Sequence, residues 1–124
     1  MRSSFLGDGG NPADTVTVRV LDGDPAVVRV TGRLLFDTLR PLAEALDGLT
    51  GVNGSRIVLD LAEVPMCDSS ALNLLVRTRS AVDATGGWLR LASVRPMVAS
   101  VLEITNLTWI LPVFDTPEEA AAQA

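Results

Sequence analysis

The sequence contains no histidine and no tyrosine, and its only cysteine is Cys67. Without histidine, neither a Ser-His-Asp nor a Cys-His catalytic arrangement can be built from this chain. One cysteine cannot form an internal disulfide, and without histidine partners it makes no ordinary zinc site. The composition therefore argues against an enzyme, and we expect a protein that uses neither a metal nor another cofactor.

Lysine is also absent: all ten basic residues are arginine, and the 15 acidic residues give a net charge of −5. This balance argues against nucleic acid as a partner, because phosphate binding needs a basic patch. The longest apolar runs are far shorter than the roughly twenty residues that span a bilayer. The first residues, MRSSFLGDGG, lack the apolar core of a signal peptide. We therefore expect a cytoplasmic protein that does not insert into a membrane.

The 124 residues, of which 48% are hydrophobic, suit one compact domain. Residues 1–14 are rich in Gly, Ser, Asp and Pro, and we expect a mobile leader there, followed by the domain over 15–124. The order β-β-α-β-α-β-α-β-α predicts an α/β fold with a mixed, mostly parallel sheet of about five strands flanked by helices. The hydrophobic pattern places strands over 15–20, 26–30, 56–61, 88–92 and 109–114, and helices over 36–49, from 68 to about 84, from 96 and from 117.

Some details of this pattern carry further expectations. Phe36 falls on the apolar face of the first helix, within which Pro41 marks either a kink or a later start. The strand over 56–61 is apolar at nearly every position, which is typical of a central strand covered on both faces. Pro112 places the last strand at an edge or makes it irregular, and Asn106 suits a left-handed helix cap.

The most informative segment joins the central strand to the second helix and contains Asp68-Ser69-Ser70. Asp68 is a good N-cap, because its carboxylate can accept hydrogen bonds from the exposed amides of the first turn. Those amides and the positive end of the helix dipole suit an anion, so Ser69 is a reasonable phosphoacceptor on physical grounds. The same tripeptide is also an ordinary capping sequence, and the residues alone leave both interpretations open.

From about Thr15 to Ala122 the chain resembles a STAS domain, and most closely a bacterial anti-sigma factor antagonist. The resemblance rests on an Ile-Val-Leu-Asp-Leu strand followed by Asp68-Ser69-Ser70-Ala71-Leu72, then Gly86-Gly87, and then Leu102-Glu103-Ile104-Thr105-Asn106-Leu107. It implies a STAS-like single domain in which Ser69 is the phosphoacceptor. The implied partner-binding residues are Met66, Cys67, Asp68, Ser69 and Ser70, together with Arg33 and Leu35.

The same resemblance implies a switch. The unmodified protein would bind an anti-sigma factor, which is a serine kinase of the histidine-kinase-like ATPase type, and so free a sigma factor. Phosphorylation of Ser69 by that kinase would separate the two proteins, and a serine phosphatase would reset the switch. The residues leave the oligomeric state open.

One segment departs from the family pattern. Gly32-Arg33-Leu34-Leu35 stands where the family usually has Gly-Glu-Leu/Ile-Asp, so Arg33 and Leu35 replace two acidic residues. This change favours an alternative, a STAS scaffold or transporter-associated interaction module without a phosphorylation switch. We interpret Cys67 as a small buried hydrophobe rather than a redox group. Trp88 and Trp109 are interpreted as core or rim aromatics, although an exposed one would be a natural binding hot spot.

Overall fold

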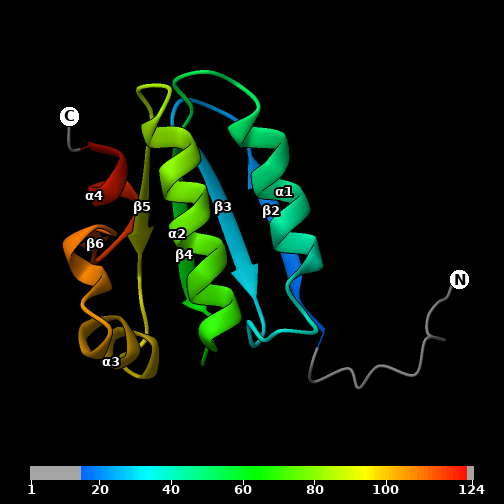
Figure 1. Ribbon diagram of the computed structural model, residues 1–124, viewed down its shortest axis with the longest axis vertical. Helices are drawn as coiled ribbons and strands as arrows, with labels where there is room; N and C mark the ends of the chain where they lie inside the picture. Colours follow the sequence, from blue (N-terminus) through cyan, green and yellow to red (C-terminus); the bar gives the residue numbers. More distant parts are fainter. Residues whose placement is uncertain (1–14, 123–124) are drawn as a thin grey trace, which may run out of the picture.

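The chain forms one sheet flanked by helices in the computed structural model, which describes residues 15–122 (Figure 1). The elements are β2 (Thr17–Leu21), β3 (Ala26–Thr31), α1 (Arg40–Thr50), β4 (Arg56–Glu63), α2 (Ser69–Asp83), β5 (Trp88–Ala92), α3 (Pro96–Ile104), the 3-10 helix η2 (Leu107–Trp109), β6 (Val113–Phe114) and α4 (Pro117–Ala122). This order of strands and longer helices confirms the predicted α/β fold. The expected leader over 1–14 lies outside the described residues.

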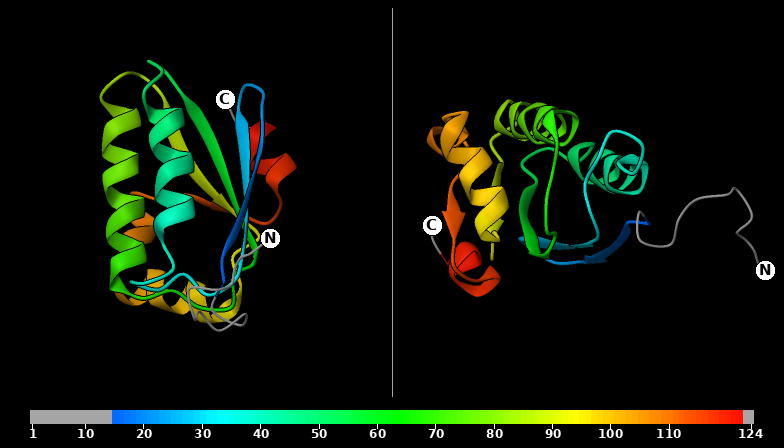
Figure 2. Two further views of the ribbon diagram at one scale, coloured as in Figure 1. Left: turned by 90° about the vertical axis from the view of Figure 1, so that its right-hand side faces the viewer. Right: turned by 90° about the horizontal axis from the view of Figure 1, so that it is seen from below.

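The five strands lie in the order β2-β3-β4-β5-β6. The hairpin β2–β3 is antiparallel, whereas β3, β4, β5 and β6 run parallel, so the sheet is mixed and mostly parallel as predicted. Helices α1 and α2 cover one face of the sheet and α4 lies on the other (Figure 2). The middle of β4 is therefore buried on both faces, which confirms its predicted central position.

The main core lies between the sheet and the pair α1 and α2. Its apolar side chains alternate along the strands, because successive strand residues point to opposite faces. The largest fully buried side chains are Leu34, Leu42, Leu46, Ile57, Leu59, Leu61, Leu75, Leu89, Leu91, Leu102, Leu111 and Val28.

A smaller apolar cluster, Val58, Ala92 and Ala120, joins α4 to the opposite face of the sheet. Arg90 also contacts α4, because its guanidinium donates a hydrogen bond to the backbone oxygen of Ala120 at 2.9 Å. The same guanidinium lies 3.7 Å from the centroid of the Trp88 ring. Half-buried Trp88 is thus a rim aromatic, as the sequence suggested.

The first helix begins later than predicted. It starts at Arg40, with Pro41 in its first turn, where the missing proline N–H removes no helical hydrogen bond. The preceding residues form a turn in which the Thr38 amide donates to the backbone oxygen of Leu35 at 2.9 Å. The expectation that Phe36 packs on the helix face was therefore wrong: its side chain is 80% exposed.

The strand predicted over 109–114 was also wrong in extent. Only Val113–Phe114 pairs with β5, and η2 precedes it. Pro112 has no N–H to give to a strand ladder and contributes only its backbone oxygen, which accepts from Leu91 at 2.9 Å. Trp109 is consequently 84% exposed instead of lying in the core or at its rim. Asn106 adopts the predicted left-handed conformation, with φ of 61°.

Smaller differences concern strand ends. The first strand begins at Thr17 rather than at 15, and β4 continues to Glu63 beyond its predicted end at 61.

The carboxyl ends of β3, β4 and β5 point to the same end of the molecule (Figure 1). The loop before α1, the first turn of α2 and helix α3 gather at that end, which is where ligands and partners of open α/β sheets bind.

Candidate functional site

The site is built on the N-cap of α2. Asp68 has an extended backbone, with φ of −104° and ψ of −175°, and its Oδ1 accepts a hydrogen bond from the Ala71 amide at 3.1 Å. This bond satisfies one of the amides that a helix start leaves without a partner. The capping role predicted for Asp68 is therefore confirmed.

The second carboxylate oxygen of Asp68 makes a bond that the sequence analysis missed. Oδ2 accepts from the Phe36 amide at 2.8 Å, across 32 positions of sequence. The Asp68 side chain thus caps α2 and is also hydrogen-bonded to the loop before α1. Pro41, as a marker of the later helix start, was the available signal that Phe36 lies in a loop with an amide free for such a bond.

Backbone hydrogen bonds reinforce this connection. The Leu34 amide donates to the oxygen of Met66, and the Asp68 amide donates to the oxygen of Leu34, both at 3.1 Å. Leu34 and Cys67 form a parallel β-bridge. We call residues 33–36 and 66–70, which these bonds hold side by side, the clasp.

Ser69 is the first residue of α2 and its side chain is exposed, whereas Ser70 and Met66 are half-buried. Among residues 15–122, no acceptor is bonded to the amides of Ser69 and Ser70, because the Asp68 carboxylate is engaged with Ala71. The accessible Ser69 hydroxyl therefore belongs to the same first turn as two backbone N–H groups and the positive end of a 15-residue helix.

The remaining predicted site residues contribute differently. Arg33 and Leu35 are half-buried, and the clasp brings them beside the start of α2. Cys67 is only 9% exposed, and burial together with the nearby Asp68 charge raises the pKa of its thiol. A protonated, enclosed thiol is poorly reactive. Phe36, which the sequence analysis did not assign to the site, presents the most exposed large apolar side chain of the clasp.

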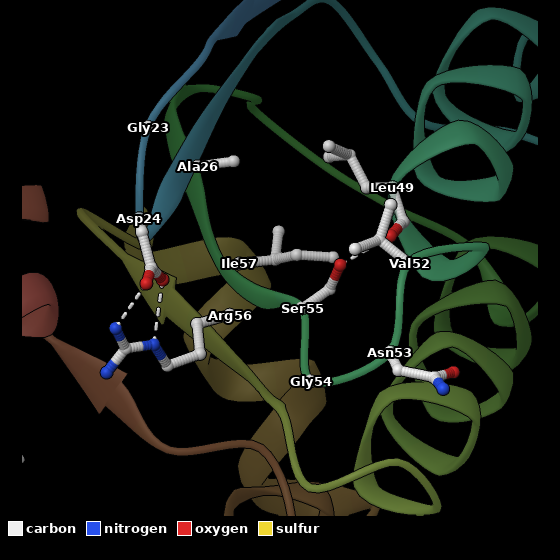
Figure 3. A pocket seen from close by; sticks show the side chains of 10 residues that line it. All are labelled: Gly23, Asp24, Ala26, Leu49, Val52, Asn53, Gly54, Ser55, Arg56 and Ile57. Atoms are coloured by element: carbon white, nitrogen blue, oxygen red, sulfur yellow. Dashed lines mark hydrogen bonds and ion pairs between the residues drawn. The ribbon is translucent and has the colours of Figure 1, made fainter.

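A pocket of about 300 Å³ opens elsewhere, at the amino end of β4 (Figure 3). The Asp24 carboxylate lies at its edge and accepts hydrogen bonds from Arg56 Nε at 2.8 Å and Nη2 at 2.6 Å. These hydrogen bonds and the arginine charge lower the pKa of Asp24. Because β4 ends at Glu63 near the clasp, the pocket and Ser69 lie at opposite ends of the sheet.

Three observations describe the chemical character of the site and of the chain around it. Within the described part of the chain, no three His, Cys, Asp or Glu residues lie close enough together to hold a metal ion. Over the same residues, no helix has both the length and the apolar character needed to cross a membrane. The site combines the exposed Ser69 hydroxyl with both apolar and polar residues of the clasp.

Comparison with known proteins gives a consistent result. Residues 15–120 match the family model of the STAS domain. A protein of Thermotoga neapolitana, named as a homologue of the anti-sigma factor antagonist TM1081, is 38% identical over 66 residues, which are 53% of this chain and 58% of that protein. The match thus spans little more than half of that relative's length.

Solved structures share the fold. An anti-sigma factor antagonist from Mycobacterium paratuberculosis superposes with a TM-score of 0.78 at 24% identity, covering 89% of this chain and 93% of that one. The phosphorylated form of the Bacillus cell fate determinant SpoIIAA superposes with a TM-score of 0.64 at 19% identity, covering 85% of this chain and 95% of that one. These likenesses establish the architecture.

Proposed function

Because the chain belongs to the STAS domain family, we propose that it is an anti-sigma factor antagonist that is controlled by phosphorylation at Ser69. The observation that carries the proposal is the exposed Ser69 hydroxyl at the start of α2, held in place by the Asp68 cap. Support also comes from relatives that are named anti-sigma factor antagonists and from a neighbour that is known in a phosphorylated form.

The proposed partner is an anti-sigma factor that is itself a serine kinase of the histidine-kinase-like ATPase type, and the complex forms in the cytoplasm. It docks on the clasp of the unmodified protein, with the exposed Phe36 ring as an apolar contact beside Ser69. Arg33, Leu35 and Met66 flank the same surface. A serine phosphatase returns the phosphorylated protein to the binding state.

Phosphorylation acts through charge. A phosphate on Ser69 adds about −1.5 to −2 charges, which the two free amides and the helix dipole partly offset, so the fold is retained. In the complex the same phosphate is desolvated next to the Asp68 carboxylate. An uncompensated charge in a buried interface costs about 3–5 kcal/mol, which corresponds to roughly two to three and a half decades in affinity. This cost separates the proteins without a change of fold.

The test uses the purified protein, ATP and each ATPase-type serine kinase encoded in the same genome. Mass spectrometry is expected to locate the phosphate on Ser69, and Ser69→Ala is expected to abolish modification while retaining binding. The matched control is Ser80→Ala, which removes an exposed hydroxyl of α2 outside the clasp and leaves phosphorylation intact. Ser69→Asp is expected to weaken binding of the kinase.

Two results would contradict the proposal. One is phosphate on another residue with Ser69 unmodified. The other is recovery of a membrane transporter or a large assembly, with no ATPase-type kinase, when the unmodified protein is used as bait, because that outcome supports a scaffold or transporter-associated module.

A further inference from the structure

Within residues 15–122, the β2–β3 half of the sheet is exposed on the side away from α1 and α2. On that side, α4 contacts β4, β5 and β6 (Figure 2). The pairing register places the outward residues of β2 directly opposite those of β3, in three rows across the hairpin. We call this surface the hairpin face; it consists of the rows Thr17–Thr31, Arg19–Arg29 and Leu21–Val27. All six side chains are exposed except Val27, which is half-buried.

The middle row of the hairpin face is electrostatically unfavourable. Arg19 and Arg29 are directly opposite each other in an antiparallel pair, where like charges destabilise a sheet. Asp60, the neighbour of Arg29 on β4, lies 3.4 Å from its Nε. Within residues 15–122, Arg19 makes no ion pair. Within the same residues, Asp60 therefore pairs with Arg29 and leaves Arg19 without a carboxylate, and Asp60 Oδ1 also accepts a hydrogen bond from the Ala62 amide at 3.1 Å.

This cationic row stands out in a chain whose net charge is −5. We propose that the hairpin face binds an acidic segment of a partner protein, whose carboxylates pair with Arg19 and Arg29. Guanidinium groups match carboxylates in a two-bonded geometry. The Leu21–Val27 row on one side and the Thr17–Thr31 row on the other offer apolar and hydroxyl contacts to the same short segment.

The size and surroundings of the hairpin face favour a short protein segment over a larger polyanion. A nucleic acid or an anionic bilayer extends its charge beyond three rows of residues and meets the acidic remainder of the chain. The hairpin face and the clasp also lie on different parts of the molecule, with the sheet between the hairpin face and α2. The middle row, Arg19–Arg29, therefore lies on the opposite face of the sheet from α2.

The test uses a hexaglutamate peptide at low ionic strength, with hexalysine as the charge-reversed control. Backbone amide shifts are expected to move with hexaglutamate in β2 and β3, and Arg19→Gln is expected to weaken this binding at least tenfold. Arg77→Gln, which removes an exposed arginine from α2, is the matched control and leaves binding unchanged. Because Arg19 faces Arg29, Arg19→Gln is also expected to raise the urea midpoint of the unbound protein.

Several outcomes would overturn the inference. These are shifts spread over all arginines, equal weakening by Arg77→Gln, or a lower urea midpoint in Arg19→Gln. The inference would also be overturned if Arg19-dependent binding to phosphatidylserine vesicles or to DNA were stronger than binding to hexaglutamate. That result would identify a membrane or a nucleic acid, rather than a protein segment, as the partner of the hairpin face. The extent of Ser69 phosphorylation is expected to be the same in Arg19→Gln and the native protein. Failure of the hairpin-face proposal can therefore be distinguished from failure of the proposed phosphorylation switch.

Discussion

Replacing Asp68 with alanine removes both bonds of the carboxylate at once. Loss of a helix N-cap costs about 1 kcal/mol, and loss of the Oδ2 bond to the Phe36 amide costs about another 1 kcal/mol, because that bond is exposed to solvent. We therefore expect Asp68→Ala to lower the free energy of unfolding by about 2 kcal/mol. For a domain of this size, the melting temperature would fall by about 8 °C.

Urea denaturation followed by circular dichroism measures the free energy, and amide hydrogen exchange follows Phe36. Asp68→Asn separates the two bonds: its side-chain oxygen can still cap α2, whereas its amide group is a donor that cannot accept from Phe36. We expect an intermediate loss of stability and rapid exchange at Phe36. The control Asp83→Ala removes the same charge at the other end of α2 and should cost nothing, because an acid is unfavourable there. A loss below about 0.5 kcal/mol in Asp68→Ala, or one equal to that of the control, would refute this account of the clasp.

Two further predictions concern other parts of the fold. A Cβ on Gly87 would lie 1.9 Å from a backbone oxygen in the loop before β4, so Gly87→Ala is expected to cost more than about 3 kcal/mol in urea denaturation or to prevent folding. The matched change Gly48→Ala meets open space within α1 and should stabilise by about 0.5–1 kcal/mol; similar results for the two variants would contradict this reasoning. The lowered pKa of Asp24 means that its pairing with Arg56 stabilises the fold above the ordinary value of 3.8 and that this contribution disappears as the pH falls through the lowered value. In NMR titrations, Arg56→Gln should raise the Asp24 midpoint toward 3.8, whereas Arg77→Gln should leave it unchanged; an unchanged midpoint in Arg56→Gln would show that the ion pair is not formed in solution.

Much of the fold follows from local patterns. The apolar run in β4 and the Asp68 cap act over a few residues, and both were predicted from the sequence. The start of α1 was not, because Phe36 lies at helical spacing from buried Leu42 and Leu46, while its amide is bound by a carboxylate 32 positions away. Hydrophobic spacing carries no information about such a distant hydrogen bond.

The same limit applies to the last strand and to the charged surfaces. The apolar residues 109–114 resemble a strand, but Pro112 restricts pairing with β5 to Val113–Phe114 and leaves Trp109 exposed. The facing of Arg19 and Arg29 depends on the register of the β2–β3 hairpin. A sequence predicts that a hairpin forms more readily than it predicts which residues meet across it.

The double engagement of Asp68 has a consequence for how this protein can vary. Because the Asp68 carboxylate binds the backbone amide of Phe36, a change that shifts the backbone near position 36 and a substitution of Asp68 act on the same hydrogen bond, and their effects on stability are not expected to add. The cost of a change near position 36 is therefore expected to depend on whether Asp68 is present. We therefore expect the two stretches to be inherited as a matched pair, so that grafting either one alone into a homologue would fail where grafting both succeeds.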